Sequence, residues 1–76
     1  MSQSLACLIR IVANRAGITE ADILGPSRLR KITEPRQFVM YLAHKRGMSL
    51  PQIGRIMGRH HTTVLHGVRA EEARRK

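Results

Sequence analysis

The sequence predicts an all-α fold, a small helical domain of roughly five helices that contains a helix-turn-helix. Apolar residues recur every three or four positions along most of the chain, which is the spacing of one helical face. Hydrophobic residues make up 42% of the chain, but the only aromatic ones are Phe38 and Tyr41, so the core must be aliphatic. No segment has a convincing strand pattern. With 76 residues, we expect positions 1–76 to form a single domain.

The first two helices are expected in the N-terminal third of the chain. The first runs from about Ser4 to Ala16 and ends at Gly17. Its apolar stripe consists of Leu5, Leu8, Ile9, Val12 and Ala16. A short second helix is expected at Glu20–Leu24, because Thr19 suits an N-cap and acidic residues occupy the first turn. Gly25 and Pro26 should end this helix.

A basic connector is expected next, followed by a third helix. The stretch "SRLRKITEP", residues 27–35, carries several cations. Pro35 fits the first turn of a helix, with Thr33 or Glu34 as the cap, and the helix should continue to about Arg46. Gly47 should end it. The side that it turns to the core is predicted to carry Phe38, Val39, Leu42 and Ala43.

The last two helices give the helix-turn-helix pattern. Ser49 with Gln52 three residues later is the capping-box pattern that begins a helix, and Gly58 should end that helix. Its inner face is predicted to carry Ile53, Ile56 and Met57. The fifth helix is expected to start near His60 or His61 and to continue toward Lys76. Its inner face is predicted to carry Val64, Leu65 and Val68. In such a motif, the start of the second helix meets base edges in the major groove.

The charge of the chain favours a polyanionic partner. Fourteen Lys and Arg against five Asp and Glu give a formal net charge of +9, which most often indicates nucleic acid, although it can serve solubility alone. The single cysteine, Cys7, excludes an internal disulfide and favours a reduced compartment. No segment is predicted to span a membrane or to act as a signal peptide. We therefore expect a cytoplasmic, nucleoid-associated protein.

The stretch "MGRHHTTVLHGVR", residues 57–69, is the candidate functional site. Its histidines lack the i, i+4 pair that places two imidazoles on one helical face, and no acidic residue lies between Met48 and Ala70. Acid–base catalysis would need an orienting carboxylate, and all five acids lie elsewhere in the chain. We therefore predict no metal, no cofactor and no enzymatic activity.

Nucleic-acid binding suits the residue types of this stretch. If Val64 and Val68 face inward, helical geometry places Thr62, His66 and Arg69 on the opposite side. The residues that precede or begin the helix are Arg59, His60 and His61. Hydroxyl, imidazole and guanidinium groups all suit base edges or phosphates. The alternatives are that Thr62 and Thr63 only cap the helix and that His61 is half-buried.

A longer segment resembles a known family. The segment "EPRQFVMYLAHKRGMSLPQIGRIMGRHHTTVLHGVR", residues 34–69, is similar to the C-terminal DNA-binding domain of the bacterial replication initiator DnaA. That family has a proline-arginine-glutamine helix start and a serine-leucine-proline-x-isoleucine-glycine helix. It also has a glycine-arginine-aspartate-histidine-threonine-threonine-valine motif. A weaker similarity extends back to about Thr19.

The resemblance implies an all-helical domain that binds short asymmetric boxes in duplex DNA. It implies base contacts for His61 and Thr62 and a backbone contact for Thr63. Arg28, seven residues before Pro35, would enter the minor groove. The residues that match phosphate-contacting positions are Arg36, Gln37, Leu50, Pro51 and His66. Together with the residues singled out above, the predicted DNA-binding set is Arg28, Arg30, Arg36, Gln37, Leu50, Pro51, Arg59, His60, His61, Thr62, Thr63, His66 and Arg69.

Two departures from the family bear on the target sequence. His60 stands where the family has an aspartate, and the turn has one glycine where the family usually has two. We expect no ATPase domain in these residues, so that binding itself is the activity. The predicted function is therefore a sequence-specific double-stranded-DNA-binding protein, preferably a transcriptional regulator derived from a phage or mobile element. The alternatives are a modulator of replication initiation that occupies origin boxes, and an adaptor that binds RNA polymerase or the host initiator. Self-association into a homodimer is also predicted. RNA binding is disfavoured, because the chain has few aromatic residues that could stack on bases.

Overall fold

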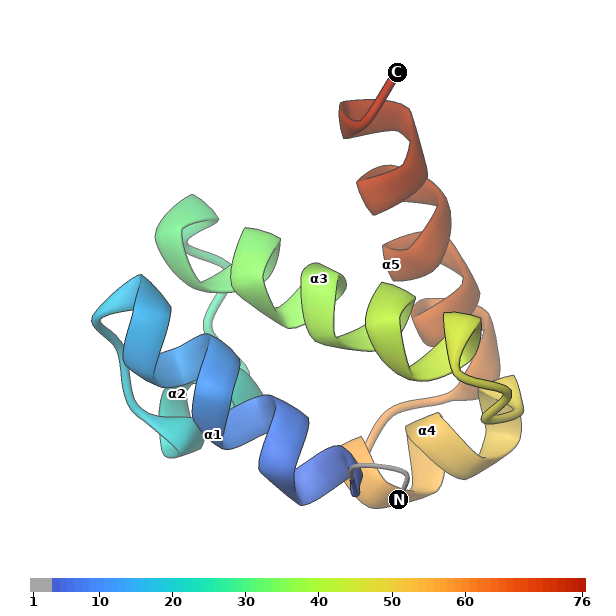
Figure 1. Ribbon diagram of the computed structural model, residues 1–76, viewed down its shortest axis with the longest axis horizontal. Helices are drawn as coiled ribbons and strands as arrows, with labels where there is room; N and C mark the ends of the chain where they lie inside the picture. Colours follow the sequence, from blue (N-terminus) through green and yellow to red (C-terminus); the bar gives the residue numbers. More distant parts are fainter. Residues whose placement is uncertain (1–3) are drawn as a thin grey trace.

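A computed structural model describes residues 4–76, which form five α-helices and no strand (Figure 1). The helices are α1 (Leu5–Ala16), α2 (Glu20–Leu24), α3 (Arg30–Lys45), α4 (Leu50–Met57) and α5 (His61–Arg74). The predicted all-α class is confirmed. Helix α3 crosses the middle of the molecule and contacts each of the other four helices. Within residues 4–76, no helix has the length and hydropathy needed to cross a membrane.

The core is aliphatic, as the composition predicts. Val39 and Ala43 of α3 pack with Ile53 of α4 and Val64 of α5, and none of these side chains has exposed surface. The stripe predicted for α1 is buried except for Ala16, which is exposed, while Ala13 is buried in its place. Phe38, Leu42 and Leu65, which are predicted to face inward, are only half-buried. Ile56 of α4, also predicted to face inward, is exposed. The remaining buried hydrophobic residues are Leu5, Leu8, Ile9, Val12, Ile23, Ile32, Met40, Met57 and Val68.

The caps of α2 and α4 are those that the sequence predicts, and Ser4, where the first helix is expected to begin, caps α1. The Ser4 hydroxyl accepts a hydrogen bond from the Cys7 backbone N–H at 3.1 Å. Thr19 and Asp22 form a reciprocal capping box at α2, and Ser49 and Gln52 form one at α4. Each box satisfies backbone N–H groups that a helix start would otherwise leave unpaired. These local hydrogen bonds fix where the short helices begin.

The start of α3 differs from the prediction. The helix begins at Arg30, so Pro35 lies inside it, and neither Thr33 nor Glu34 is the cap. As the sixth residue of the helix, Pro35 cannot donate to the Lys31 carbonyl and crowds it, which is a local cost to the helix. Burial of Ile32 in the preceding turn supports the longer helix. The loop between α2 and α3 is therefore short, residues 25–29.

Candidate nucleic-acid interface

Helices α4 and α5 form the predicted helix-turn-helix. Gly58 ends α4 with φ of 69°, a left-handed conformation that glycine adopts without strain. The Arg59 N–H then donates to the Gly54 carbonyl at 2.8 Å, which closes the turn. Val64 and Val68 anchor α5 to the core. This anchoring sets which face of α5 points to solvent.

The exposed face of α5 carries the polar residues that helical geometry places opposite the valines. His60, at the cap, and His61, Thr62, Thr63, His66 and Arg69 are all exposed. We call these six residues the recognition surface. The alternative of a half-buried His61 is wrong. On the inner side, Gly67 lets α5 approach α3, because a Cβ there would come within 2.5 Å of the Met40 Sδ atom.

The cap of α5 is His60. Its Nδ1 atom accepts a hydrogen bond from the Thr62 backbone N–H at 3.3 Å and lies 2.8 Å from the Thr62 hydroxyl oxygen. Its ring also lies against that of His61, with the ring centroids 4.3 Å apart. The alternative in which Thr62 or Thr63 caps the helix is therefore wrong. Accepting this hydrogen bond requires an unprotonated Nδ1 atom, a role that an aspartate oxygen fills without any tautomer requirement.

Replacing His60 by aspartate should stabilise the domain. Aspartate is among the best N-cap residues, and its negative charge interacts favourably with the helix N-terminus. We expect His60→Asp to raise the free energy of unfolding by about 0.5–1 kcal/mol in urea denaturation followed by circular dichroism. His66→Asp, which places the same charge one and a half turns further along α5, is the control and should give no such gain. An equal gain in both variants would assign the effect to net charge rather than to capping.

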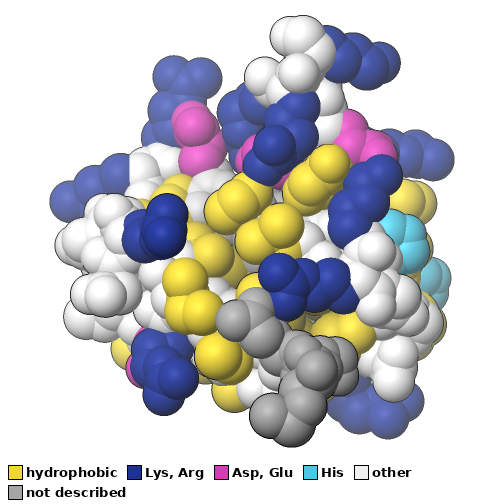
Figure 2. Space-filling view, viewed as in Figure 1, with side chains coloured by type: hydrophobic (Ala, Val, Ile, Leu, Met, Phe, Trp, Pro, Cys, Tyr) yellow, Lys and Arg dark blue, Asp and Glu magenta, His cyan; other side chains and the backbone are white. Residues whose placement is uncertain are grey.

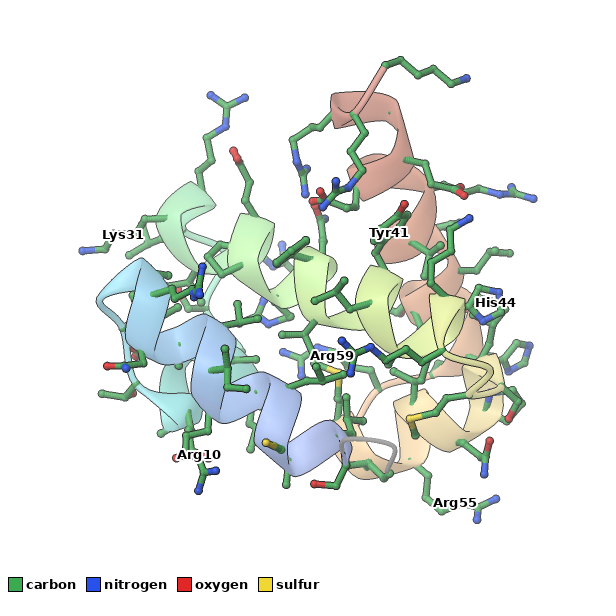
Figure 3. The ribbon with its side chains drawn as sticks, viewed as in Figure 1. Arg10, Lys31, Tyr41, His44, Arg55 and Arg59 are labelled. Atoms are coloured by element: carbon green, nitrogen blue, oxygen red, sulfur yellow. The ribbon has the colours of Figure 1, made fainter. Side chains whose placement is uncertain are left out.

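Arg59 points into the molecule instead of toward a ligand. Its guanidinium donates to the carbonyl oxygens of Met57 at 2.8 Å and Leu24 at 3.3 Å, and also to that of Gly25. Figure 3 shows Arg59 near the centre of the view, whereas Arg10 and Arg55 point outward. Burial lowers the pKa of the Arg59 guanidinium. The structure thus places Arg59 between the helix-turn-helix and the 25–29 loop.

Arg36 is the second inward-facing arginine and is only 7% exposed. Its guanidinium donates to four backbone carbonyl oxygens at 2.7–3.0 Å, those of Asp22, Ile23, Gly25 and Ser27. Burial and the neighbouring charge of Arg59 lower its pKa. Arg36 and Arg59 share the Gly25 carbonyl, so together they fasten the 25–29 loop to α3 and to the turn. This differs from the phosphate-contacting role expected for Arg36, because four of its five N–H groups already donate to carbonyls inside the domain.

The other predicted residues lie at the surface in varied surroundings. Arg28, on the loop that the two arginines fasten, is exposed and makes no hydrogen bond or ion pair with another residue of 4–76. Arg30 is also exposed but pairs with Glu34 at 2.8 Å. Gln37 accepts a hydrogen bond from Arg74 at 2.8 Å. At the start of α4, Leu50 is half-buried and Pro51 is exposed.

Most of the chain is similar to bacterial replication initiator proteins. The family model described as "Bacterial dnaA protein helix-turn-helix" matches residues 6–70. The chromosomal replication initiator protein DnaA of Cereibacter sphaeroides is 52% identical over 65 residues, which cover 83% of this chain and 14% of that protein. The protein of the same name from Roseobacter denitrificans is 49% identical over the same shares of both chains. That from Xanthobacter autotrophicus is 47% identical over 64 residues, 82% of this chain and 13% of that protein. The chain thus spans about one seventh of the length of these relatives.

Proposed function

This chain belongs to the bacterial DnaA helix-turn-helix family, and from that premise we propose that it binds double-stranded DNA in a sequence-specific manner. The observation that carries the proposal is the recognition surface, in which exposed polar side chains gather on the first turns of α5. Buried Val64 and Val68 hold that helix in one orientation. A rigid helix with a polar leading end suits insertion into the major groove.

We assign base contacts to the start of α5. His61 and Thr62 would face base edges, because a hydroxyl, a methyl group and an imidazole nitrogen match the donors, acceptors and thymine methyl found there. Thr63, His66 and Arg69 would contact the phosphate backbone. The same phosphate backbone would be contacted by Leu50 and Pro51, at the start of α4, and by Gln37. The cap hydrogen bond with Thr62 holds His60 at the helix start, where it takes the place of the family aspartate.

Arg28 would read the minor groove beside this site. A narrow minor groove attracts arginine because its electrostatic potential is strongly negative. The hydrogen bonds of Arg36 and Arg59 to the Gly25 carbonyl support this role, since they fix the 25–29 loop relative to the helix-turn-helix. The net charge of +9 would supply much of the affinity through counterion release.

We propose that residues 1–76 act as one DNA-binding domain at the nucleoid. Regulation of transcription is the role we favour, because His60 replaces an acceptor side chain and should change the preferred base pair. The second candidate, occupancy of origin boxes to modulate replication initiation, rests on the identity to replication initiators. An adaptor that binds RNA polymerase or the initiator without specific DNA contacts would leave the recognition surface without a ligand.

Selection from a random duplex pool tests the proposal, and we expect a single enriched motif. Thr62→Ala and Arg28→Ala should each weaken binding to that motif by about tenfold, since a good base contact contributes roughly 1–3 kcal/mol of discrimination. Binding to unrelated duplex DNA should change much less. Affinities would be measured by fluorescence anisotropy at two salt concentrations, because backbone contacts depend on salt.

Arg10→Ala is the matched control for Arg28→Ala. Arg10 is also exposed, carries the same charge and points away on α1 (Figure 3). We expect it to lower affinity for all sequences slightly and alike. A selection that returns no motif would contradict specific binding. An equal loss for Arg10→Ala and Arg28→Ala would contradict the minor-groove role of Arg28.

A further inference from the structure

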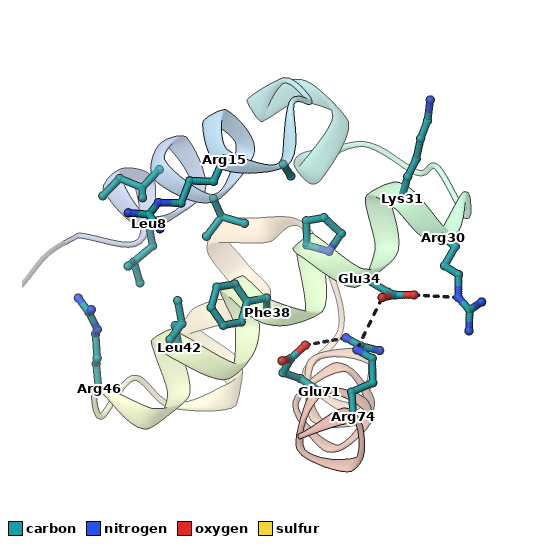
Figure 4. A pocket seen from close by; sticks show the side chains of 14 residues that line it. Leu8, Arg15, Arg30, Lys31, Glu34, Phe38, Leu42, Arg46, Glu71 and Arg74 are labelled. Carbon is teal, nitrogen blue, oxygen red and sulfur yellow. Dashed lines mark hydrogen bonds and ion pairs between the residues drawn. The ribbon is translucent and has the colours of Figure 1, made fainter. Parts of the chain in front are cut away.

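A large apolar groove lies between α1 and α3, away from the recognition surface (Figure 4). We call it the α1/α3 groove; its floor is formed by Leu8, Ile11, Val12, Pro35, Phe38 and Leu42. Its volume is about 1220 Å³. In Figure 2 the corresponding hydrophobic side chains form a central patch, while histidine side chains lie at the edge of the view. Ile11 is 37% exposed there, so the patch meets solvent.

Cations surround this groove. Five basic residues line it, and only two carboxylates do, those of Glu34 and Glu71; the basic residues are Arg15, Arg30, Lys31, Arg46 and Arg74. Both carboxylates are already neutralised, Glu34 by Arg30 at 2.8 Å and Glu71 by Arg74 at 2.7 Å. Arg75 also pairs with Glu71, at 3.0 Å, and its guanidinium carbon lies 5.1 Å from the centre of the Phe38 ring. The groove therefore combines an apolar floor with a positively charged rim.

We propose that the α1/α3 groove binds an amphipathic helix with acidic flanks from a partner protein. An amphipathic helix places its apolar face in such a groove, with anchors at i, i+3, i+4 and i+7. The floor would receive those anchors, and carboxylates on the helix flanks would meet Arg15 and Lys31. The 12 residues of α1 extend about 18 Å, enough to accompany about three turns of a bound helix.

Two other occupants suit the groove less well. A second copy of this chain would bring another charge of +9 to a rim that is already positive. Nucleic acid would satisfy the rim but would leave its phosphates over an apolar floor, where they lose hydration. The groove involves α1, α3 and the C-terminal part of α5, whereas the recognition surface lies at the N-terminal part of α5. The two sites share no residue of the recognition surface, and only Arg30, two residues from Arg28, lies on the rim near the proposed minor-groove contact. We therefore expect both sites to be occupied at once, which would bring an acidic partner to a chosen DNA site.

The test uses a labelled peptide of about 18 residues with leucine at helical i, i+3 and i+4 positions and glutamate elsewhere. A twin peptide with lysine in place of glutamate is the charge control. Fluorescence anisotropy with the full chain should show binding of the acidic peptide only. Ile11→Asp should weaken that binding by about tenfold or more, because a carboxylate would then lie in the floor. Ile56→Asp, the same change at an exposed isoleucine of α4, should not weaken it.

A charge-reversal pair on α1 separates the groove from general attraction to a basic protein. Arg15 lines the groove and Arg10 does not, so Arg15→Glu should weaken peptide binding severalfold more than Arg10→Glu. Circular dichroism of all four variants checks that they fold. Equal losses for Arg10→Glu and Arg15→Glu, binding of the lysine twin, or insensitivity to Ile11→Asp would overturn the proposal. So would a concentration-dependent dimer in sedimentation that Ile11→Asp abolishes, or duplex DNA that competes with the peptide.

Discussion

Replacement of Arg36 by alanine should lower the free energy of unfolding by about 3 kcal/mol. The guanidinium is buried and donates to four backbone carbonyls between positions 22 and 27. Without it, those carbonyls lose their charged donor, and a buried acceptor left unpaired costs about 1–3 kcal/mol. Water entering the new cavity would recover part of that loss. Urea denaturation followed by circular dichroism measures the change.

Two further variants separate the fork of hydrogen bonds from the charge. Arg36→Lys keeps the charge, but the single lysine nitrogen cannot donate to all four carbonyls. We therefore expect this variant to recover less than half of the free energy of unfolding that Arg36→Ala loses. Arg30→Ala removes an arginine of the same helix whose side chain is 91% exposed, and it should change stability by at most about 0.5 kcal/mol. If Arg36→Ala instead kept full stability and weakened binding to all DNA sequences alike, Arg36 would be a surface phosphate contact.

Arg59 extends the same network to the helix-turn-helix. Both guanidiniums donate to the Gly25 carbonyl, and Arg59 also reaches the carbonyl of Met57 at the end of α4. Residues that share a hydrogen-bonding partner do not contribute independently. We therefore infer that Arg36 and Arg59 act together to hold the 25–29 loop beside the turn. Arg28 lies on that loop. In our proposal, the spacing between minor-groove and major-groove contacts depends on these two arginines.

Most of the fold could be predicted because its signals are local. Ser4, Thr19 and Ser49 each cap a helix through neighbours three residues away, and Gly17 and Gly58 end helices with positive φ. The start of α3 escaped prediction because Leu29 occupies the cap position and makes no side-chain hydrogen bond there. A helix start without a cap leaves no pattern in the sequence. Pro35 then supplied a plausible but wrong start.

The part of the site on α5 could be predicted, because helical periodicity decides which of its side chains are exposed. Val64 and Val68 fix the inner face of α5, and the exposed face follows by rotation. The roles of Arg36 and Arg59 were not predictable, because their partners are backbone carbonyls up to 35 residues away in sequence. Every residue has such a carbonyl, so no residue type reveals the pairing. The cap formed by His60 was missed because histidine is not among the usual capping residues.

Gly54→Ala should destabilise the domain, although glycine-to-alanine changes inside a helix usually stabilise by about 0.5–1 kcal/mol. Gly54 is buried in α4, and a Cβ atom there would overlap the Arg59 carbonyl oxygen. The carbonyl carbons of Arg59 and His60 would lie 3.4 Å and 3.5 Å away. These atoms belong to the backbone of the turn, which cannot move aside as a flexible side chain can.

The change therefore has to displace the turn that carries α5. We expect a loss of about 2–4 kcal/mol in the free energy of unfolding, as overpacking against a rigid neighbour produces. Gly58→Ala is the control: its Cβ would meet no atom within 4 Å, so only the positive φ is strained, at about 1 kcal/mol. In the Gly54→Ala protein that remains folded, we expect the start of α5 to be displaced. Its affinity for the selected DNA motif should therefore fall as well. Stabilisation by Gly54→Ala, with DNA binding unchanged, would mean that the backbone of α4 and the turn do not approach each other this closely. Gly58 would then be the only glycine that the turn between α4 and α5 requires.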